Sequence, residues 1–110
     1  MMSRRLVMRP QAVRDLDEQI AYFVVNASKA VAIRFAHMAN ETIEMIMEMP
    51  ELGAPWESDA AKLQGLRYRM MKRFKRHVVF YRVTDEAIEI DRILRGSRNL
   101  EQYLLEIDEV

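Results

Sequence analysis

Residues 65–98 read GLRYRMMKRFKRHVVFYRVTDEAIEIDRILRGSR and alternate apolar with polar residues over much of their length. A repeat of two is the pattern of a strand with one buried and one exposed face. The stretch divides into three such runs, at 66–72, 77–83 and 87–94, with connections short enough for hairpin turns. We therefore predict three antiparallel strands that follow one another in the chain.

Positive charge is concentrated in the same part of the chain. Eleven of the 17 Lys and Arg residues fall within residues 62–98, which contain four acidic residues. Residues 1–61 carry a net charge of −3 and residues 99–110 one of −4, so the total is zero. A sheet with such a cationic region is suited to an anionic partner, either a nucleic acid or an acidic protein segment. An ordinary solvated surface is the simpler alternative.

The N-terminal half predicts one strand and two helices. Residues 4–9 form a short strand-like run that Pro10 ends, and proline is favoured in the first turn of a helix. Apolar residues then recur at helical spacing from Val13 to Val24, and again from Val31 to Met49. Ser28 lies between the two helical patterns and can cap the second helix. The short connection implies an antiparallel helical hairpin.

The remaining segments complete the predicted fold. Residues 51–64 contain a glycine and a proline but no periodicity, and we predict a loop there. Asn99 and Gln102 resemble a capping box at the start of a final short helix. We expect residues 1–110 to form one domain. The predicted class is α+β: an N-terminal strand, an antiparallel helical hairpin, a three-stranded antiparallel meander completing the sheet, and a short C-terminal helix, in the order β-α-α-β-β-β-α.

The composition argues against several kinds of site. The chain has no cysteine, which excludes disulfides and thiolate chemistry and suits a cytoplasmic location. Its apolar runs are far shorter than the ~20 residues that a membrane helix needs. His37 and His77 lie on different predicted elements without a partner at ligand spacing, so we expect no metal, and no cofactor motif is present. Asp15, Asp17 and Glu18 are interpreted as acids that complement a helix dipole.

Cationic side chains form the candidate site. One group belongs to the first strand of the meander and its turn, and a second group to the last strand and the residues after it. They are Arg67, Arg69, Lys72, Arg73, Lys75 and Arg76, and Arg92, Arg95 and Arg98. Three adjacent antiparallel strands can bring both groups to one edge. Arginine binds phosphate through paired hydrogen bonds, and Tyr68, Tyr81 and Tyr103 are available to stack on bases.

Short motifs occur in a characteristic order along the chain. They are A-x-x-D-L at 12–16, MPELG at 49–53, GLR at 65–67, VVFYRV at 78–83, IEIDRIL at 88–94 and RGSRN at 95–99. In order and spacing they resemble the RelE/ParE toxins of bacterial type II toxin–antitoxin systems, over nearly the whole chain. The resemblance implies a toxin that uses no cofactor and is neutralised by an antitoxin whose C-terminal segment wraps around it.

The toxins that the chain resembles divide by activity. ParE-type members poison DNA gyrase and trap cleaved DNA, whereas RelE-type members cleave messenger RNA on the ribosome with several cationic groups. The resemblance aligns Arg98 with a catalytic arginine and Arg69 with a catalytic lysine of the RNA-cleaving type, and Tyr103 lies one residue from its catalytic tyrosine. Met71 and Val78 fall where that type needs cationic groups. Loss of one such group should slow phosphoryl transfer by orders of magnitude.

The sequence therefore favours a ParE-like toxin that inhibits DNA gyrase by binding, without being an enzyme. Its expected partner is a cognate ParD-like antitoxin, with which it would form a hetero-oligomer. The residues expected to contact partners are Arg67, Arg69, Lys72, Arg73, Arg95, Arg98 and Tyr103. The alternative is a RelE-like, ribosome-dependent mRNA endoribonuclease, and a third reading is an inactive member that only binds its antitoxin. The charge-stabilising or acid–base groups of the nuclease would be Arg69, Lys72, Arg98 and Tyr103.

Overall fold

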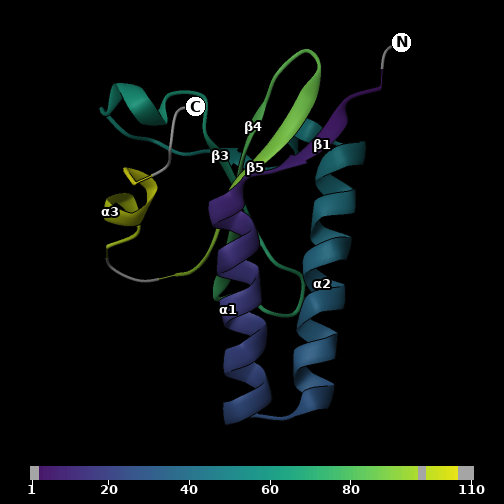
Figure 1. Ribbon diagram of the computed structural model, residues 1–110. Coiled ribbons are helices and arrows are strands. Elements are labelled where there is room, and N and C mark those ends of the chain that lie inside the picture. The colour runs from purple at the N-terminus through teal and green to yellow at the C-terminus, as the bar shows by residue number, and fades with distance from the viewer. Residues whose placement is uncertain (1–2, 97–98, 107–110) are drawn as a thin grey trace.

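The structure is a computed structural model, and it describes residues 3–96 and 99–106 (Figure 1). Within these ranges the chain folds into three α-helices and a five-stranded sheet. The strands are β1 (Arg5–Met8), β2 (Ala54–Pro55), β3 (Arg67–Met70), β4 (His77–Val83) and β5 (Ala87–Arg95). The helices are α1 (Pro10–Asn26), α2 (Lys29–Glu48) and α3 (Leu100–Leu104). The predicted α+β class is confirmed.

The strands lie in the order β1-β5-β4-β3-β2, so the first strand of the chain lies beside the last. β3, β4 and β5 form the predicted antiparallel meander, and β1 pairs with β5 in parallel. Arg9 N donates to Ile90 O at 3.0 Å, one residue before α1 begins. This bond places the start of α1 beside the middle of β5.

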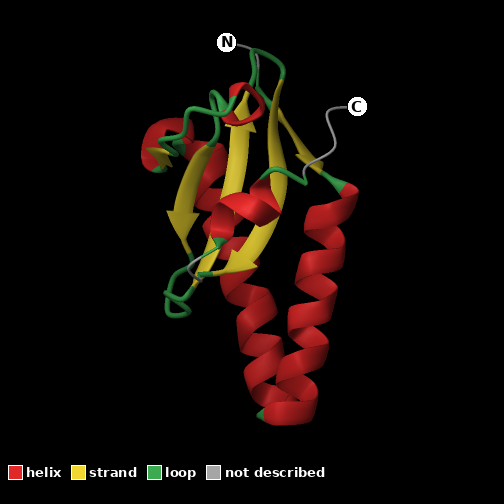
Figure 2. Cartoon of the chain, turned by 90° about the vertical axis from the view of Figure 1, so that its left-hand side faces the viewer, coloured by secondary structure: helices red, strands yellow, loops and turns green. Residues whose placement is uncertain are grey.

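The helices α1 and α2 form a hairpin that covers one face of the sheet and extends beyond it (Figure 1 and Figure 2). Ser28 caps α2 as predicted, because its Oγ accepts a hydrogen bond from Val31 N at 3.1 Å. Pro50 disfavours helical backbone at Met49, and α2 ends at Glu48. The core between hairpin and sheet is formed by Ala12, Phe35, Ala39, Ile43, Ile46, Met71, Val79, Tyr81, Ile88, Ile90 and Ile93.

The opposite face of the sheet carries a second, smaller core. It consists of Leu63, Leu66, Val78, Phe80, Leu94 and Leu104. Successive residues of β4 alternate between the two cores, so Val78 and Phe80 face α3 whereas Val79 and Tyr81 face the hairpin. Both faces of β4 are therefore buried, which accounts for its continuous apolar run.

A bulge in β5 lies at Asp91. Phe80 pairs with Arg92 and Tyr81 with Ile90, which leaves Asp91 with no residue directly opposite. A bulge bends its strand and changes the direction of the side chains next to it. Here two adjacent charged residues have different partners, because Asp91 binds Arg82 and Arg92 binds Asp15.

The predicted loop at 51–64 is wrong in detail. This segment contains β2, and short 3-10 helices form at Pro50–Leu52 and Ala61–Leu63. Arg82 orders its second half by donating to two carbonyl oxygens there, at 2.6 and 2.7 Å. A long-range side-chain contact of this kind leaves no periodicity in the segment it holds.

The predicted capping box at Asn99 is also wrong. The Asn99 backbone (φ −116°, ψ 34°) is not extended, and its side chain makes no capping hydrogen bond. A capping box requires an extended residue whose side chain folds back over the first turn. Other segments hold α3 instead: Trp56 Nε1 donates to Glu101 Oε1 at 3.2 Å, and side chains from elsewhere bind the carbonyls at its C-terminal end.

Candidate functional site

The β3–β4 turn and the end of β5 lie together at one end of the sheet. His77, the first residue of β4, pairs with Arg95, the last residue of β5. Gly96 N also donates to Arg76 O. The turn cations and Arg95 are thus brought together, as the order of the strands predicts.

In the β3–β4 turn the charged side chains point outward, and the ring of Phe74 points inward. Lys72, Arg73, Lys75 and Arg76 are exposed, whereas Phe74 packs against the main core. Arg73 adopts a left-handed backbone with φ of 68°, a conformation that a non-glycine residue rarely takes. This turn conformation places four cationic side chains close together on the surface.

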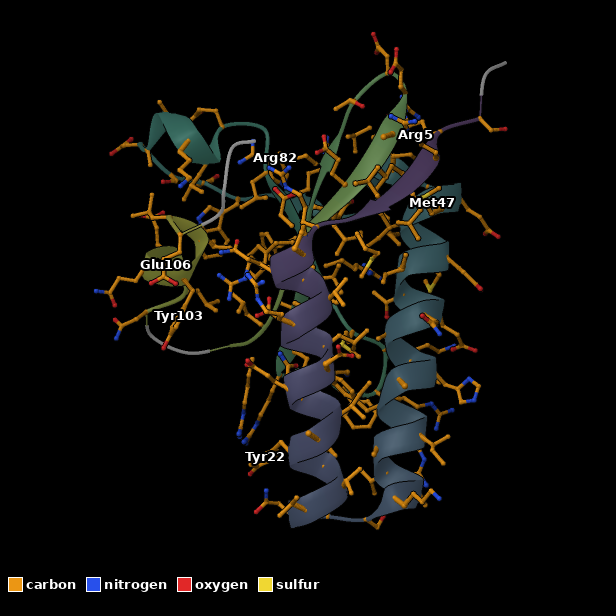
Figure 3. The ribbon with its side chains drawn as sticks, in the orientation of Figure 1. Arg5, Tyr22, Met47, Arg82, Tyr103 and Glu106 are labelled. Atoms are coloured by element: carbon orange, nitrogen blue, oxygen red, sulfur yellow. The ribbon has the colours of Figure 1, made fainter. Side chains whose placement is uncertain are left out.

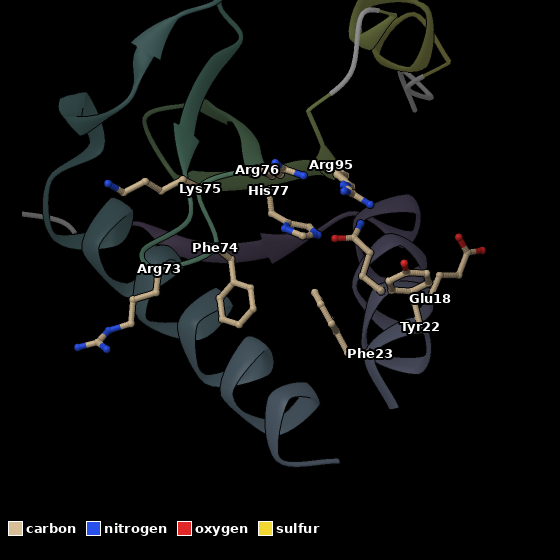
Figure 4. Close-up of a pocket in the computed structure, with 10 residues that line it drawn as sticks. Glu18, Tyr22, Phe23, Arg73, Phe74, Lys75, Arg76, His77 and Arg95 are labelled. Atoms are coloured by element: carbon tan, nitrogen blue, oxygen red, sulfur yellow. The ribbon is translucent and has the colours of Figure 1, made fainter. Parts of the chain in front are cut away.

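A cavity of about 620 Å³ lies between α1, this turn and the end of β5 (Figure 4). Its apolar lining comes from Tyr22, Phe23 and Phe74, with the His77 ring beside them. The rings of Phe23 and Phe74 meet at 5.6 Å between centroids, edge to face. The polar side chains that line the cavity are Glu18, Gln19, Arg73, Lys75, Arg76 and Arg95. The cavity is therefore apolar inside and mainly cationic at its rim.

His77 contributes a polar atom to this cavity. The residue is 8% exposed, and its Nδ1 has no hydrogen-bond partner in the described part of the chain. Burial lowers the pKa of His77 below its usual 6.5, and the positive charge of Arg95 lowers it further. The imidazole is consequently neutral near pH 7 and can both donate and accept a hydrogen bond.

A second hollow of about 410 Å³ lies on the α2 side of the same turn. Arg69 and Lys72 line it together with apolar Met45 and Met70. Its full lining is Thr42, Met45, Arg69, Met70, Met71, Lys72, Arg73 and Lys75. Arg73 and Lys75 line both hollows, so the turn separates two sites that share cations.

Tyr103 lies on the other face of the sheet. It is 47% exposed and lines a third hollow with Leu94, Arg95 and Gly96. Arg69 pairs with Val79, whose side chain faces the helical hairpin, so Arg69 lies on the hairpin side of the sheet. The structure therefore does not gather Arg69 and Tyr103 into one cluster.

Other predicted site residues have different surroundings. Arg67 lies at the opposite end of β3 from the turn, and its Nη1 donates to Gly53 O at 2.7 Å. Tyr68 packs edge to face with Trp56, and Tyr81 is fully buried, so Tyr81 offers no ring face for stacking. Arg98 lies outside the described residues.

Tyr81 has a structural role instead. Its hydroxyl donates to Pro50 O at 2.7 Å and accepts from Gly53 N at 2.8 Å. A Cβ at Gly53 would lie 2.5 Å from that hydroxyl, so the position requires glycine. Burial raises the pKa of Tyr81, which keeps the phenol protonated.

A buried ion pair was missed by the sequence reasoning. Arg92 Nε and Nη2 donate to the two carboxylate oxygens of Asp15 at 2.8 and 2.9 Å, and both residues are buried. Hence Asp15 is not a helix-dipole acid, and Arg92 is not part of the exposed cationic group. The sequence signal is the helical spacing that places Asp15 and Gln19 on one face with Ala12, and the structure shows that Ala12 is fully buried.

Arg92 also binds the C-terminal helix. Arg92 Nη1 donates to Tyr103 O at 3.0 Å, Lys62 Nζ to Leu105 O at 2.7 Å, and Gln11 Nε2 to Glu106 O at 3.1 Å. Figure 3 labels Tyr103 on this helix and Glu106 in the turn after it. Carbonyls at a helix end have no partner within the helix. Donors from three other segments supply those partners and fix α3 in place.

Among residues 3–96 and 99–106, no three His, Cys, Asp or Glu side chains gather as metal ligands would. No helix in these ranges is both long and apolar enough to cross a membrane.

Solved structures share this fold. The chromosomal ParDE toxin–antitoxin system from P. aeruginosa matches with a TM-score of 0.72 and 23% identity, over 86% of this chain and 98% of that one. The YoeB/ParE toxin from Agrobacterium tumefaciens has a TM-score of 0.59 and 17% identity, over 84% and 99%. The YoeB dimer from Staphylococcus aureus has a TM-score of 0.54 and 24% identity, over 86% and 99%.

Comparison of sequences gives the family. No curated protein sequence matches the chain. The family model described as the ParE toxin of the type II toxin–antitoxin system parDE matches residues 6–100. Because this match spans most of the chain, the protein belongs to the ParE toxin family of type II toxin–antitoxin systems.

Proposed function

We propose that this toxin inhibits DNA gyrase by binding rather than by cleaving RNA, and that a cognate antitoxin neutralises it. The main support is the burial of Met71 and Val78, at positions where the nuclease type needs cations. Met71 is 1% exposed and Val78 is 7% exposed, and they belong to different cores on opposite faces of the sheet. A charge at either position would have to leave water at high cost.

The position of Arg69 adds to this argument. A nuclease site needs its cationic and acid–base groups around one phosphate. Arg69 and Lys72 line the hollow beside α2, whereas Tyr103 lines the hollow beside α3. This separation favours a toxin that acts through an extended contact surface.

The contact surface that we propose is the cationic end of the sheet. It comprises Arg73 and Arg95, with Lys72 and Arg69 on the α2 side and Tyr103 on the α3 side. Arg98 lies outside the described residues and is kept as a contact that the sequence predicts. The fold is similar to that of a ParDE toxin–antitoxin system. We propose a ParD-like antitoxin as the partner, with apolar residues for the hairpin and acidic residues for the cationic end. The complex would form in the cytoplasm.

Induced expression in bacteria tests the proposal. DNA integrity and messenger RNA cleavage are followed in the same cells. Gyrase inhibition predicts DNA breaks, an SOS response and filamentous cells with intact transcripts. Rapid transcript cleavage on ribosomes with intact DNA would instead establish the nuclease.

Charge reversal locates the surface in the same assay. Arg95→Glu should abolish toxicity, because it reverses a charge of the cationic end. Arg98→Glu should do the same, because the sequence predicts Arg98 as a contact. Arg5→Glu is the matched control, since Arg5 pairs with Ala87 at the other end of β5. Toxicity that survives both reversals would show that the cationic end is not the site.

A further inference from the structure

The cavity between α1, the β3–β4 turn and β5 has the features of a built binding site. Its rings, its buried imidazole and its cationic rim come from three elements that are distant in the sequence (Figure 4). We infer that it receives one apolar side chain of an acidic antitoxin segment, whose neighbouring carboxylates bind Arg76 and Arg95. This inference rests on the proposed antitoxin partner and names the site and the chemistry of its contact.

The interior of the cavity selects an apolar group. Phe23, Phe74 and His77 line it, and Tyr22 is 53% exposed at its side. Its volume of about 620 Å³ is ample for a leucine or an aromatic side chain. A partly exposed apolar hollow that accepts a single large side chain is the usual form of an interface anchor.

The unpaired nitrogen of His77 points to an occupant with a polar atom. Nδ1 is buried without a hydrogen-bond partner among the described residues, and such groups are rare in proteins because they are costly. A neutral imidazole can bind a peptide N–H, a peptide carbonyl or an indole N–H. An extended peptide segment supplies one of these next to its anchor side chain.

The rim decides the charge of the occupant. Arg76 and Arg95 line the cavity beside the His77 ring, and Glu18 is the one acid among the described residues of its lining (Figure 4). Acidic residues beside the anchor would bind these arginines in charge-assisted pairs. The complementary partner is therefore an acidic segment.

The packing of the rings favours a peptide over a nucleic acid. Phe23 and Phe74 pack edge to face with each other, and Phe35 meets Phe74 at an interplanar angle of 88°. Rings that occupy one another's faces offer few free faces for bases to stack on. The carboxylate of Glu18 would also repel a phosphate at the rim.

Occupation of the cavity would neutralise the toxin directly. Arg95 lines both this cavity and the hollow that contains Tyr103. A segment anchored here covers Arg95, which we also assign to the target contact. The antitoxin and the target would then compete for the same guanidinium.

Affinity measurements with matched charge changes test the inference. The full toxin is titrated with its cognate antitoxin, and folding of each variant is checked by circular dichroism. Arg76→Glu should weaken binding at least tenfold, whereas Glu18→Lys should tighten it, because the two changes alter the rim charge in opposite directions. The controls Arg5→Glu and Glu86→Lys, at the far end of the sheet, should leave the affinity unchanged.

Cross-linking identifies the occupant. Because the chain has no cysteine, Glu18→Cys carries a photo-cross-linker at one defined place. The expected product joins position 18 to an antitoxin segment with a large apolar residue beside acidic ones, and Glu86→Cys should give none.

The outcomes separate two kinds of failure. If the unaltered chain binds its antitoxin but the Arg76 and Glu18 variants behave like their controls, the cavity inference is overturned and the proposed function stands. If no complex forms, the proposed partner is wrong. The third outcome concerns a fluorescent single-stranded DNA 12-mer. If the unaltered chain binds this DNA and Arg76→Glu does not, while antitoxin binding persists, the cavity is a nucleic-acid site.

Discussion

Asp15 binds the edge of β5 beyond the end of β1, where β5 has no neighbouring strand on that side in the described part of the chain. Its Oδ2 accepts a hydrogen bond from Ile93 N at 3.0 Å, and Gln19, one turn later, donates to Ile93 O at 2.7 Å. Two side chains of α1 thereby do what a longer β1 would do with its backbone. Asp15 also binds Arg92 through both oxygens. One carboxylate therefore accepts a backbone hydrogen bond of β5, forms the buried ion pair and attaches α1 to the sheet.

Removal of the Asp15 carboxylate should strongly destabilise the fold. We expect Asp15→Ala to lower the free energy of unfolding by about 3–5 kcal/mol, because it leaves Arg92 charged and buried without its partner. Denaturant unfolding followed by circular dichroism measures the loss. The control Asp17→Ala, on the exposed side of α1, should change stability by at most about 0.5 kcal/mol. Equal effects of the two variants would contradict the assigned role.

His77 should make stability depend on pH. Its pKa is lower in the folded chain than the usual 6.5, so the unfolded chain binds more protons as the pH falls below that value. Stability should therefore fall as the pH is lowered from 7.5 to 5.5. His77→Phe keeps an aromatic ring in the core and should flatten this dependence, whereas His37→Gln, on the exposed side of α2, should retain it.

Asp91 affects the pH dependence of stability in the opposite direction to His77. Burial raises its pKa above the usual 3.8, despite the hydrogen bond from Arg82. The folded chain then binds the proton more readily, so this group disfavours folding as the pH rises through its own range. The slope of unfolding free energy against pH is compared between the unaltered chain and His77→Phe. Both chains contain Asp91, so its contribution cancels in the difference.

At the scale of the elements, α3 is held by other segments rather than by its own length. Five residues are too few for a helix to be stable alone. Leu104 is fully buried in the smaller core, and the side chains of Lys62, Arg92 and Gln11 bind the carbonyls at its C-terminal end. The position of Tyr103 therefore depends on residues far away in the sequence.

Loss of one of these donors should loosen α3 without unfolding the sheet. In Lys62→Ala, amide hydrogen exchange of residues 101–105 should speed up several-fold while exchange in β4 stays slow. Lys75→Ala removes an exposed lysine of the turn and is the matched control. Faster exchange throughout the molecule would mean that Lys62 supports the whole fold.

The long elements could be predicted because each carries its own signal. Helical spacing and Ser28 define α2, and apolar alternation defines β3 and β5. The bulge at Asp91, the two residues of β2 and the docking of α3 depend on contacts between distant residues. For the same reason the cationic turn was found from its composition, whereas the cavity behind it, formed with Tyr22 and Phe23 of α1, was not.

At the scale of the whole molecule, unbalanced positive charge is concentrated at one end of the sheet. The cationic turn and Arg95 lie at that end, whereas at the other end Asp85 and Glu86 of the β4–β5 turn lie beside Arg4 and Arg5. Such a concentration of charge orients an acidic partner before contact, although the net charge is zero. The fields of exposed charges decay over about 8–10 Å at moderate salt.

Association with the antitoxin should therefore depend on salt. Raising the salt from 0.05 to 0.5 M should slow association by roughly tenfold or more while dissociation changes much less. Stopped-flow mixing gives both rates. Arg95→Glu should reduce the salt dependence and Arg5→Glu should not, whereas an association rate that is independent of salt would argue against steering.

The turn at Arg73 has a consequence for how ligands of this toxin would influence one another. Arg73 and Lys75 line both the cavity beside α1 and the hollow beside α2. Two anionic ligands bound on either side of the turn would draw on the same two cations, so each would lower the affinity of the other. This coupling is reciprocal by thermodynamic linkage. The turn would thus make the two hollows antagonistic, with negative cooperativity and no change of shape.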